Sequence, residues 1–128
     1  MNLLQFLVYI SECALTYPDK YIKSGHNGPY KDPETPMRNY GHWLIIFCKC
    51  FELTGKIIYL EKIEELGEYL ISDYARPFGY SFHHRSKEGK DQCNGLIGQA
   101  WTFEALAYAS FITKNQKYSD YAQKVFFQ

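Results

Sequence analysis

Residues 42–74, HWLIIFCKCFELTGKIIYLEKIEELGEYLISDY, decide the fold class. Apolar side chains recur every three or four residues on both sides of Thr54-Gly55, a spacing that is typical of amphipathic helices. Glycine readily adopts the left-handed conformation that ends a helix, so a helix is predicted from His42 to this point. A second helix is predicted from Ile57 to Tyr74. The stretch therefore predicts an antiparallel helical hairpin.

The same pattern returns further along the chain, where a second hairpin is predicted over residues 96–127. Trp43 matches Trp101, Thr54 matches Thr113 and Tyr59 matches Tyr118, at offsets of 58, 59 and 59 residues. A repeat of this length is typical of stacked helical hairpins, in which each unit buries its apolar face against its neighbours. The sequence predicts an all-α fold of tandem hairpins in a single domain.

The segments outside the hairpins complete the predicted domain. Residues 3–15 carry apolar side chains at helical spacing, and the lack of a basic start favours a well-buried helix over a secretory signal. Residues 24–41 and 77–95 contain many glycines and prolines and are predicted to be long functional loops. The final Val125-Phe126-Phe127 leaves an apolar flank. We expect it to pair with another copy of the chain or with further hairpins of a longer chain.

Composition narrows the possible functions. Lys plus Arg and Asp plus Glu both total 14, so no net charge favours nucleic acid or an anionic membrane surface. No apolar run approaches the ~20 residues of a membrane span. The four cysteines show no disulfide spacing, which favours a reducing, cytoplasmic location. Aromatic residues make up 18% of the chain, more than a small helical core needs, so some are expected to contact a ligand.

All histidines and arginines lie in or beside the two loops. Arginine binds carboxylates and phosphates with a planar fork, and histidine exchanges protons near neutral pH. Both loops also lead to a helix N-terminus, which favours negative charge, and Asn39 and Asn94 are predicted N-caps there. These features predict a site for a polar, anionic ligand. The residues concerned are His26, Arg38, His42, Arg76, His83, His84 and Arg85.

Aromatic residues in the same places favour a sugar as the ligand, because a flat ring stacks on a sugar face. The aromatic residues in these places are Tyr30, Tyr40, Trp43, Tyr80, Phe82 and Trp101. Trp43 and Trp101 could instead be equivalent core residues that anchor each repeat. The loop acids define no pair of carboxyl groups, since sequence does not give their separation. Adjacent His83 and His84 with Cys93 make a weak zinc pattern, so no metal and no cofactor are predicted.

Two segments, 38-RNYGHWL-44 and 93-CNGLIGQAW-101, resemble repeat signatures of the α/α-toroid superfamily. That superfamily includes six-hairpin glycosidases, polysaccharide lyases and sugar epimerases. The resemblance implies that the helices beginning near His42 and Leu96 are inner helices, whose leading loops line a sugar cleft. Because toroids usually have about six hairpins, it also implies an incomplete ring.

These observations lead to two functional hypotheses. The first is a carbohydrate-active protein, or part of one, that acts on a polar glycan, including an acidic one; the residues do not distinguish a hydrolase, a lyase and an epimerase. The second is a non-catalytic helical module that binds a glycan or a protein. In the first, the catalytic candidates are His83, His84 and His42, and the substrate-binding candidates are His26, Arg38, Asn39, Trp43, Tyr80, Arg85, Asn94 and Trp101.

Overall fold

A computed structural model describes residues 1–16, 26–27, 32–33, 35–79, 81–93 and 95–127, with the side chains of residues 26, 27, 32 and 33 left out. The chain is built from helices, and the predicted all-α fold is confirmed. Two two-residue strands, β1 and β2, pair antiparallel ahead of α2. In order, the elements are α1 (Leu3–Thr16), β1 (His26–Asn27), β2 (Asp32–Pro33), α2 (Pro36–Thr54), α3 (Ile57–Leu70), α4 (Gly95–Thr113) and α5 (Gln116–Phe126).

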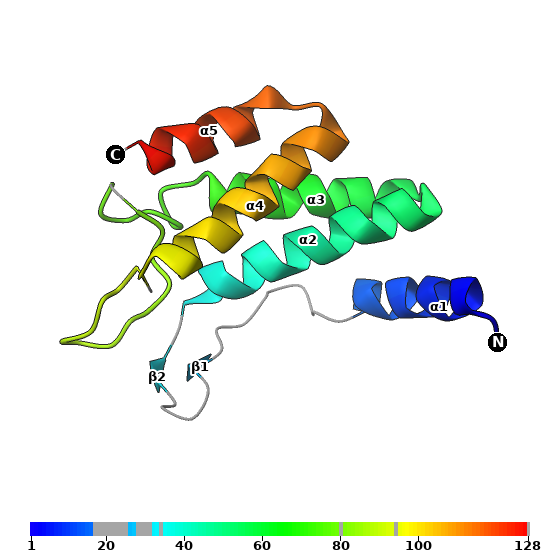
Figure 1. Cartoon of the computed structure of the whole chain (residues 1–128), viewed down its shortest axis with the longest axis horizontal. Helices are drawn as coiled ribbons and strands as arrows, with labels where there is room; N and C mark the ends of the chain where they lie inside the picture. The colour runs from blue at the N-terminus through cyan, green and yellow to red at the C-terminus, as the bar shows by residue number, and fades with distance from the viewer. Residues whose placement is uncertain (17–25, 28–31, 34, 80, 94, 128) are drawn as a thin grey trace.

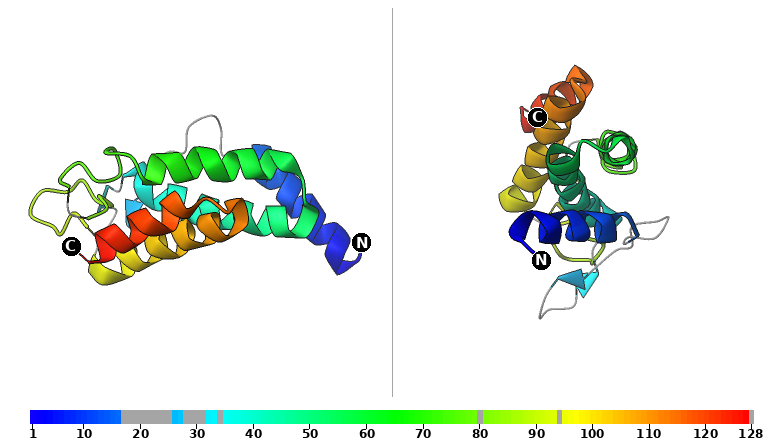
Figure 2. Two further views of the ribbon diagram at one scale, coloured as in Figure 1. Left: turned by 90° about the horizontal axis from the view of Figure 1, so that it is seen from above. Right: turned by 90° about the vertical axis from the view of Figure 1, so that its right-hand side faces the viewer.

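The helices form two stacked hairpins, α2–α3 and α4–α5 (Figure 1). α2 and α4 pack against each other and run in the same direction, while α3 and α5 run back. The two-residue turns therefore lie at one end of the bundle, and the long segments before α2 and α4 lie at the other end (Figure 1). α1 and α5 lie on opposite sides of the stack (Figure 2).

The two hairpins share the same local structure at an offset of 59 residues. α2 and α4 each contain 19 residues and are followed by a left-handed residue, Gly55 at φ 65° and Lys114 at φ 58°. The hydroxyls of Thr54 and Thr113 each donate to the carbonyl four residues earlier, both at 2.7 Å. The repeat is thus confirmed.

This offset changes one predicted equivalence. With 59 residues between the units, the counterpart of Trp43 is Thr102 and that of Trp101 is His42. The match of Trp43 with Trp101 is therefore wrong in this register, because both helices have the same length and the same C-terminal turn. The two tryptophans lie in different surroundings, as described below.

The core lies between α2, α3 and α4. Phe47 of α2 faces Tyr59 of α3 with their ring centroids 6.3 Å apart, and both are buried. Tyr118 links α5 to α3, because its hydroxyl donates to Glu68 at 2.9 Å. Burying a large apolar side chain contributes roughly 1.5–3 kcal/mol relative to leaving it exposed, so these contacts stabilise the stack.

The helix α2 begins six residues earlier than predicted, so residues 36–41 belong to it and not to the loop. Proline is favoured in the first turn because its missing N–H has no partner there, and Pro36 therefore starts the helix instead of breaking it. Asn39 lies inside α2 and is not its N-cap, which is Thr35. α3 ends at Leu70, four residues before the predicted Tyr74.

The first helix forms as predicted but is not well buried. Only Ser11 and Ala14 of α1 are buried, while Leu3 is 72% exposed and Phe6 44% exposed. The periodicity is compatible with a helix, but burial depends on which elements pack against it, and among the described elements α2 provides most of the packing for α1. Within the described residues, no helix has both the length and the apolar character needed to cross a membrane.

Candidate functional site

The segment 81–85 crosses the N-terminal ends of α2 and α4 and is fixed to both. The side-chain amide of Gln99 in α4 accepts a hydrogen bond from the Phe82 N–H at 2.9 Å and donates to the Phe82 carbonyl at 3.1 Å. Thr35, just before α2, donates through its N–H to the His84 carbonyl at 2.9 Å and through its hydroxyl to the His83 carbonyl. These bonds hold His84 where the two helices begin.

His84 is an isolated polar group in the interior. Its side chain is 1% exposed, and neither ring nitrogen has a hydrogen-bond partner of ordinary geometry among the described residues. Leaving a buried polar group unsatisfied costs roughly 1–3 kcal/mol, so such a group calls for an explanation. A buried imidazole with so few polar contacts, placed where two helices begin, is a candidate to bond a ligand.

The surroundings of His84 favour its neutral form. Burial lowers its pKa from 6.5 to about 4, and the positive charge of Arg38 and the nearby His42 act in the same direction. A contact with the Gly98 backbone, of poorer geometry than an ordinary hydrogen bond, opposes this lowering of the pKa in part. At neutral pH the ring therefore carries one free lone pair, which can accept a proton or a hydrogen bond.

Side chains from α2 and α4 complete a cluster with His84. The Arg38 guanidinium lies 5.2 Å from the ring centre of Trp101, and the His42 ring lies 5.2 Å from the same tryptophan. Arg38 and His42 are one turn apart on α2, so they present their side chains to the same neighbouring helix. We call Arg38, His42, His84 and Trp101 the His84 cluster; it brings together a cation, two imidazoles and an aromatic face.

The other predicted site residues are not all brought to this cluster. His83 is half-buried with its ring at 5.2 Å from Phe78, and Arg85 binds the Gln92 carbonyl through its backbone N–H. Trp43 packs toward Phe47 at 5.7 Å and lines an apolar cavity with Ile10, Cys13 and Ala14 of α1, whereas Trp101 contacts His42 and Arg38. Its prediction as a substrate-binding residue of the same site as Trp101 is thus not supported by its position.

Some predicted residues lie outside what the structure describes. These are Tyr80, Asn94 and the side chain of His26, whose backbone pairs with Pro33. Near the start of α4, the Asp91 carboxylate accepts from the N–H groups of Cys93 at 3.0 Å and Gly95 at 2.5 Å. This carboxylate adds negative charge at the helix N-terminus, where the dipole favours it.

Sequence reasoning assigned no role to Gln99 or Thr35, the two residues that position His84. Gln99 is nearly buried, with a third hydrogen bond from its amide to the Cys93 carbonyl at 2.7 Å. An amide one turn into an otherwise apolar helix was the available signal, because a buried amide requires several partners. Among the described residues, no group of three or more His, Cys, Asp or Glu side chains is placed to hold a metal ion.

The chain is similar to a protein that is named for glycosylation. It is 46% identical over 113 residues to the archaeal glycosylation protein Q of Haloferax volcanii, and the match covers 88% of this chain. It covers 30% of that protein, so the chain spans less than a third of the length of its relative. No family model matches the chain, and no solved structure matches it.

Proposed function

We propose that this chain is part of a carbohydrate-active protein of the α/α-toroid type that works in glycosylation. Three observations support the proposal: the similarity to a glycosylation protein, the inner-and-outer arrangement of α2 to α5, and the His84 cluster at the loop end. The observation that carries it is the buried, neutral imidazole of His84 beside a cation and an aromatic ring. The proposed ligand is a polar sugar unit, a class that includes acidic sugars.

Each member of the His84 cluster has a distinct role in this proposal. The neutral ring of His84 accepts a proton from the sugar or from water, which is the acid/base step that hydrolases, lyases and epimerases share. Arg38 binds a carboxylate or stabilises negative charge that develops during the step. Trp101 offers an apolar face to the sugar ring. His42 returns or relays the proton.

A second candidate function is a non-catalytic module that binds a glycan or a protein. It is favoured by the burial of His84, which at 1% exposure leaves little surface for a substrate unless the loop end opens. In this reading the imidazole stays a structural group, and ligands contact only the half-buried Arg38 and Trp101.

Ligand binding is tested with the tryptophan next to the cluster. In a Trp43→Phe variant, Trp101 is the sole tryptophan, and its fluorescence is followed while glucuronic acid or glucose is added. Glucuronic acid is expected to change the emission in a saturable way, with at least tenfold weaker binding in Arg38→Gln. Equal responses to both sugars would remove the anion-binding role of Arg38, and no response to either would argue against a sugar site here.

Catalysis is tested in the setting of the relative. A chimera in which this chain replaces its matched segment in the Haloferax volcanii protein is expressed in a strain lacking that protein, and the glycans of the total glycoprotein fraction are compared by mass spectrometry with those of the parent strain. His84→Gln is expected to leave the altered glycans of the deletion strain, while the matched loop control Ser86→Ala restores them. Full restoration by His84→Gln would support the non-catalytic alternative.

A further inference from the structure

α2 and α4, the two equivalent helices of the repeat, differ in the face that each exposes. Four residues on one face of α2 are buried, whereas their counterparts 59 residues later in α4 are exposed or partly exposed. Leu96, for example, is 79% exposed, while its counterpart Met37 is fully buried. The pairs are Met37 and Leu96, Gly41 and Ala100, Leu44 and Phe103, and Cys48 and Ala107.

The neighbours of each helix explain this difference. α4 packs beside α2 and also contacts α3, so it closes the space next to the first hairpin. The described residues place α2, α3 and α5 against α4, and none of them covers the face that carries Ala100 and Ala107. In the repeat, this face of α4 is the position at which another inner helix would lie.

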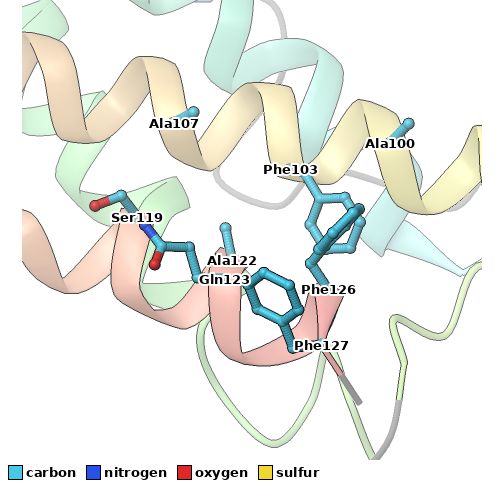
Figure 3. Close-up of a pocket in the computed structure, with 8 residues that line it drawn as sticks. All are labelled: Ala100, Phe103, Ala107, Ser119, Ala122, Gln123, Phe126 and Phe127. Carbon is cyan, nitrogen blue, oxygen red and sulfur yellow. The ribbon is translucent and has the colours of Figure 1, made fainter.

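The exposed face continues onto α5 as an apolar groove of about 520 Å³ (Figure 3). Phe103 and Phe126 pack against each other with their ring centroids 5.8 Å apart, and Phe127 packs against Phe126 at 5.1 Å. The small residues Ala100, Ala107 and Ala122 also line the groove, together with Ser119 and Gln123 of α5. Small side chains let a helix backbone approach closely, and an exposed apolar surface of this kind marks an interaction site.

We propose that this groove binds the inner helix of a third hairpin and that this helix runs parallel to α4. The third hairpin would belong to a longer protein of the same kind as the relative. The helix would hold the place on α4 and α5 that α4 holds on α2 and α3. The relative supplies the necessary chain, since the matched segment is 30% of its length. The inference rests on the hairpin repeat and is independent of any sugar chemistry.

A second copy of this chain fits the groove less well. In chain order α1 precedes α2 as α3 precedes α4, each across a long connection. A copy stacked after α5 would therefore begin with a helix of the α3 and α5 kind, although the open position on α4 requires a helix of the α4 kind. Its leading helix would compete with α5 for the outer position.

Thiol labelling distinguishes these occupants. Ala107→Cys introduces a small side chain in the groove, and Glu61→Cys is the matched control on the exposed face of α3. Each is made in the 128-residue chain and in the chimera with the Haloferax volcanii protein, and the labelling rate by a maleimide is followed for each cysteine by peptide mass spectrometry. The exposed Cys13 serves as a native reference for reagent activity.

We expect the thiol at position 107 to be labelled at least tenfold more slowly in the chimera than in the 128-residue chain, with unchanged labelling at position 61. Equal rates at position 107 in both proteins would overturn the proposal. Slow labelling in the 128-residue chain that depends on its concentration would overturn it in favour of a second copy. A chimera that does not fold would also count against it, because the proposal requires this face to accept helices of the relative. The inference thus rests on the toroid type named in the proposed function, but none of these outcomes depends on sugar binding, so they are separable from a failure of the carbohydrate-related role.

Discussion

In the α2–α3 hairpin, the buried hydroxyl of Tyr59 has no hydrogen-bond partner among the described residues, whereas at the equivalent position in α4–α5 the hydroxyl of Tyr118 donates to Glu68. The backbone around the two tyrosines is the same, because both follow a helix that ends in the same turn. What differs is the preceding unit: α3 supplies a carboxylate to Tyr118, and α1 supplies none to Tyr59. Local sequence thus sets the hairpin, and the neighbouring unit decides which polar groups are satisfied.

The largest expected effect concerns the loop that leads to the second hairpin. The folded state keeps His84 neutral down to a pKa of about 4, while the unfolded chain takes up a proton near pH 6.5. Stability from this difference is therefore fully present above pH 6.5 and is lost as the pH falls toward 4. The loss amounts to about 3 kcal/mol.

Urea unfolding at pH 7 and pH 4 measures this term. His84→Gln is expected to reduce the difference in unfolding free energy between the two pH values by about 3 kcal/mol, and His83→Gln, the neighbouring control, is expected to leave most of it. If His84→Gln and the unmodified chain lost the same unfolding free energy between pH 7 and pH 4, this result would contradict the prediction that His84 is buried and neutral in the folded chain.

The next effect concerns the contact between the hairpins at Gly67. A Cβ atom at this position would lie 2.8 Å from the Tyr118 ring, which is fully buried and held by Glu68. Gly67→Ala is expected to lower the unfolding free energy by about 2 kcal/mol, because overpacking outweighs the gain in helix propensity. Gly41→Ala, where no atom lies within 4 Å of the added carbon, should instead be neutral or stabilise by up to about 1 kcal/mol. Thermal unfolding of both variants makes the comparison, and similar midpoints would contradict it.

Removing the hydroxyl of Tyr59 or of Tyr118 is expected to have smaller effects on stability, and the two effects have opposite signs. Tyr59→Phe removes a buried hydroxyl without a partner and is expected to stabilise the chain by about 1 kcal/mol. Tyr118→Phe removes a hydrogen bond to a carboxylate and is expected to destabilise it by about 1 kcal/mol. Chemical denaturation of the two variants in parallel is the measurement. A loss of stability in Tyr59→Phe would show that the Tyr59 hydroxyl does make a hydrogen bond, and the difference between the two tyrosines would then not hold.

The smallest effect concerns the two turns. Left-handed backbone disfavours every residue with a Cβ, so Gly55→Ala is expected to cost about 1 kcal/mol, whereas Lys114→Gly is expected to gain about 0.5 kcal/mol. The gain is the lesser of the two because glycine also increases the freedom of the unfolded chain. Differential scanning calorimetry would detect both changes, and a stabilising Gly55→Ala would mean that the turn does not need its present conformation.

Much of this fold followed from local sequence. The hairpins, the glycine at the end of α2 and the repeat depend on periodicity and turn residues, which act over a few positions. The exposure of α1 did not follow, because burial depends on neighbours that periodicity does not identify. The start of α2 at Pro36 does not follow from the breaker residues of segment 24–41, because proline breaks a helix interior but is accepted in its first turn.

The candidate site followed in part. Arg38, His42, His84 and Trp101 were selected for their residue types, and the structure gathers them. Trp43 was grouped with Trp101 by similarity of sequence, but a shift of one residue in a helix turns a side chain by about 100°. The roles of Gln99 and Thr35 could not be predicted, because each acts on a segment that comes close only through tertiary packing.

The two-residue turns and the long segments before α2 and α4 lie at opposite ends of the bundle (Figure 1), and this arrangement has a practical consequence. The two-residue turns at residues 55–56 and 114–115 lie far from the end where segment 81–85 meets α2 and α4 (Figure 1). An affinity tag, a dye or a surface linker attached at the turn end would leave the opposite end facing the solution. The chain can therefore be immobilised in one defined orientation, and ligand screening by surface methods becomes possible without touching the cluster under study.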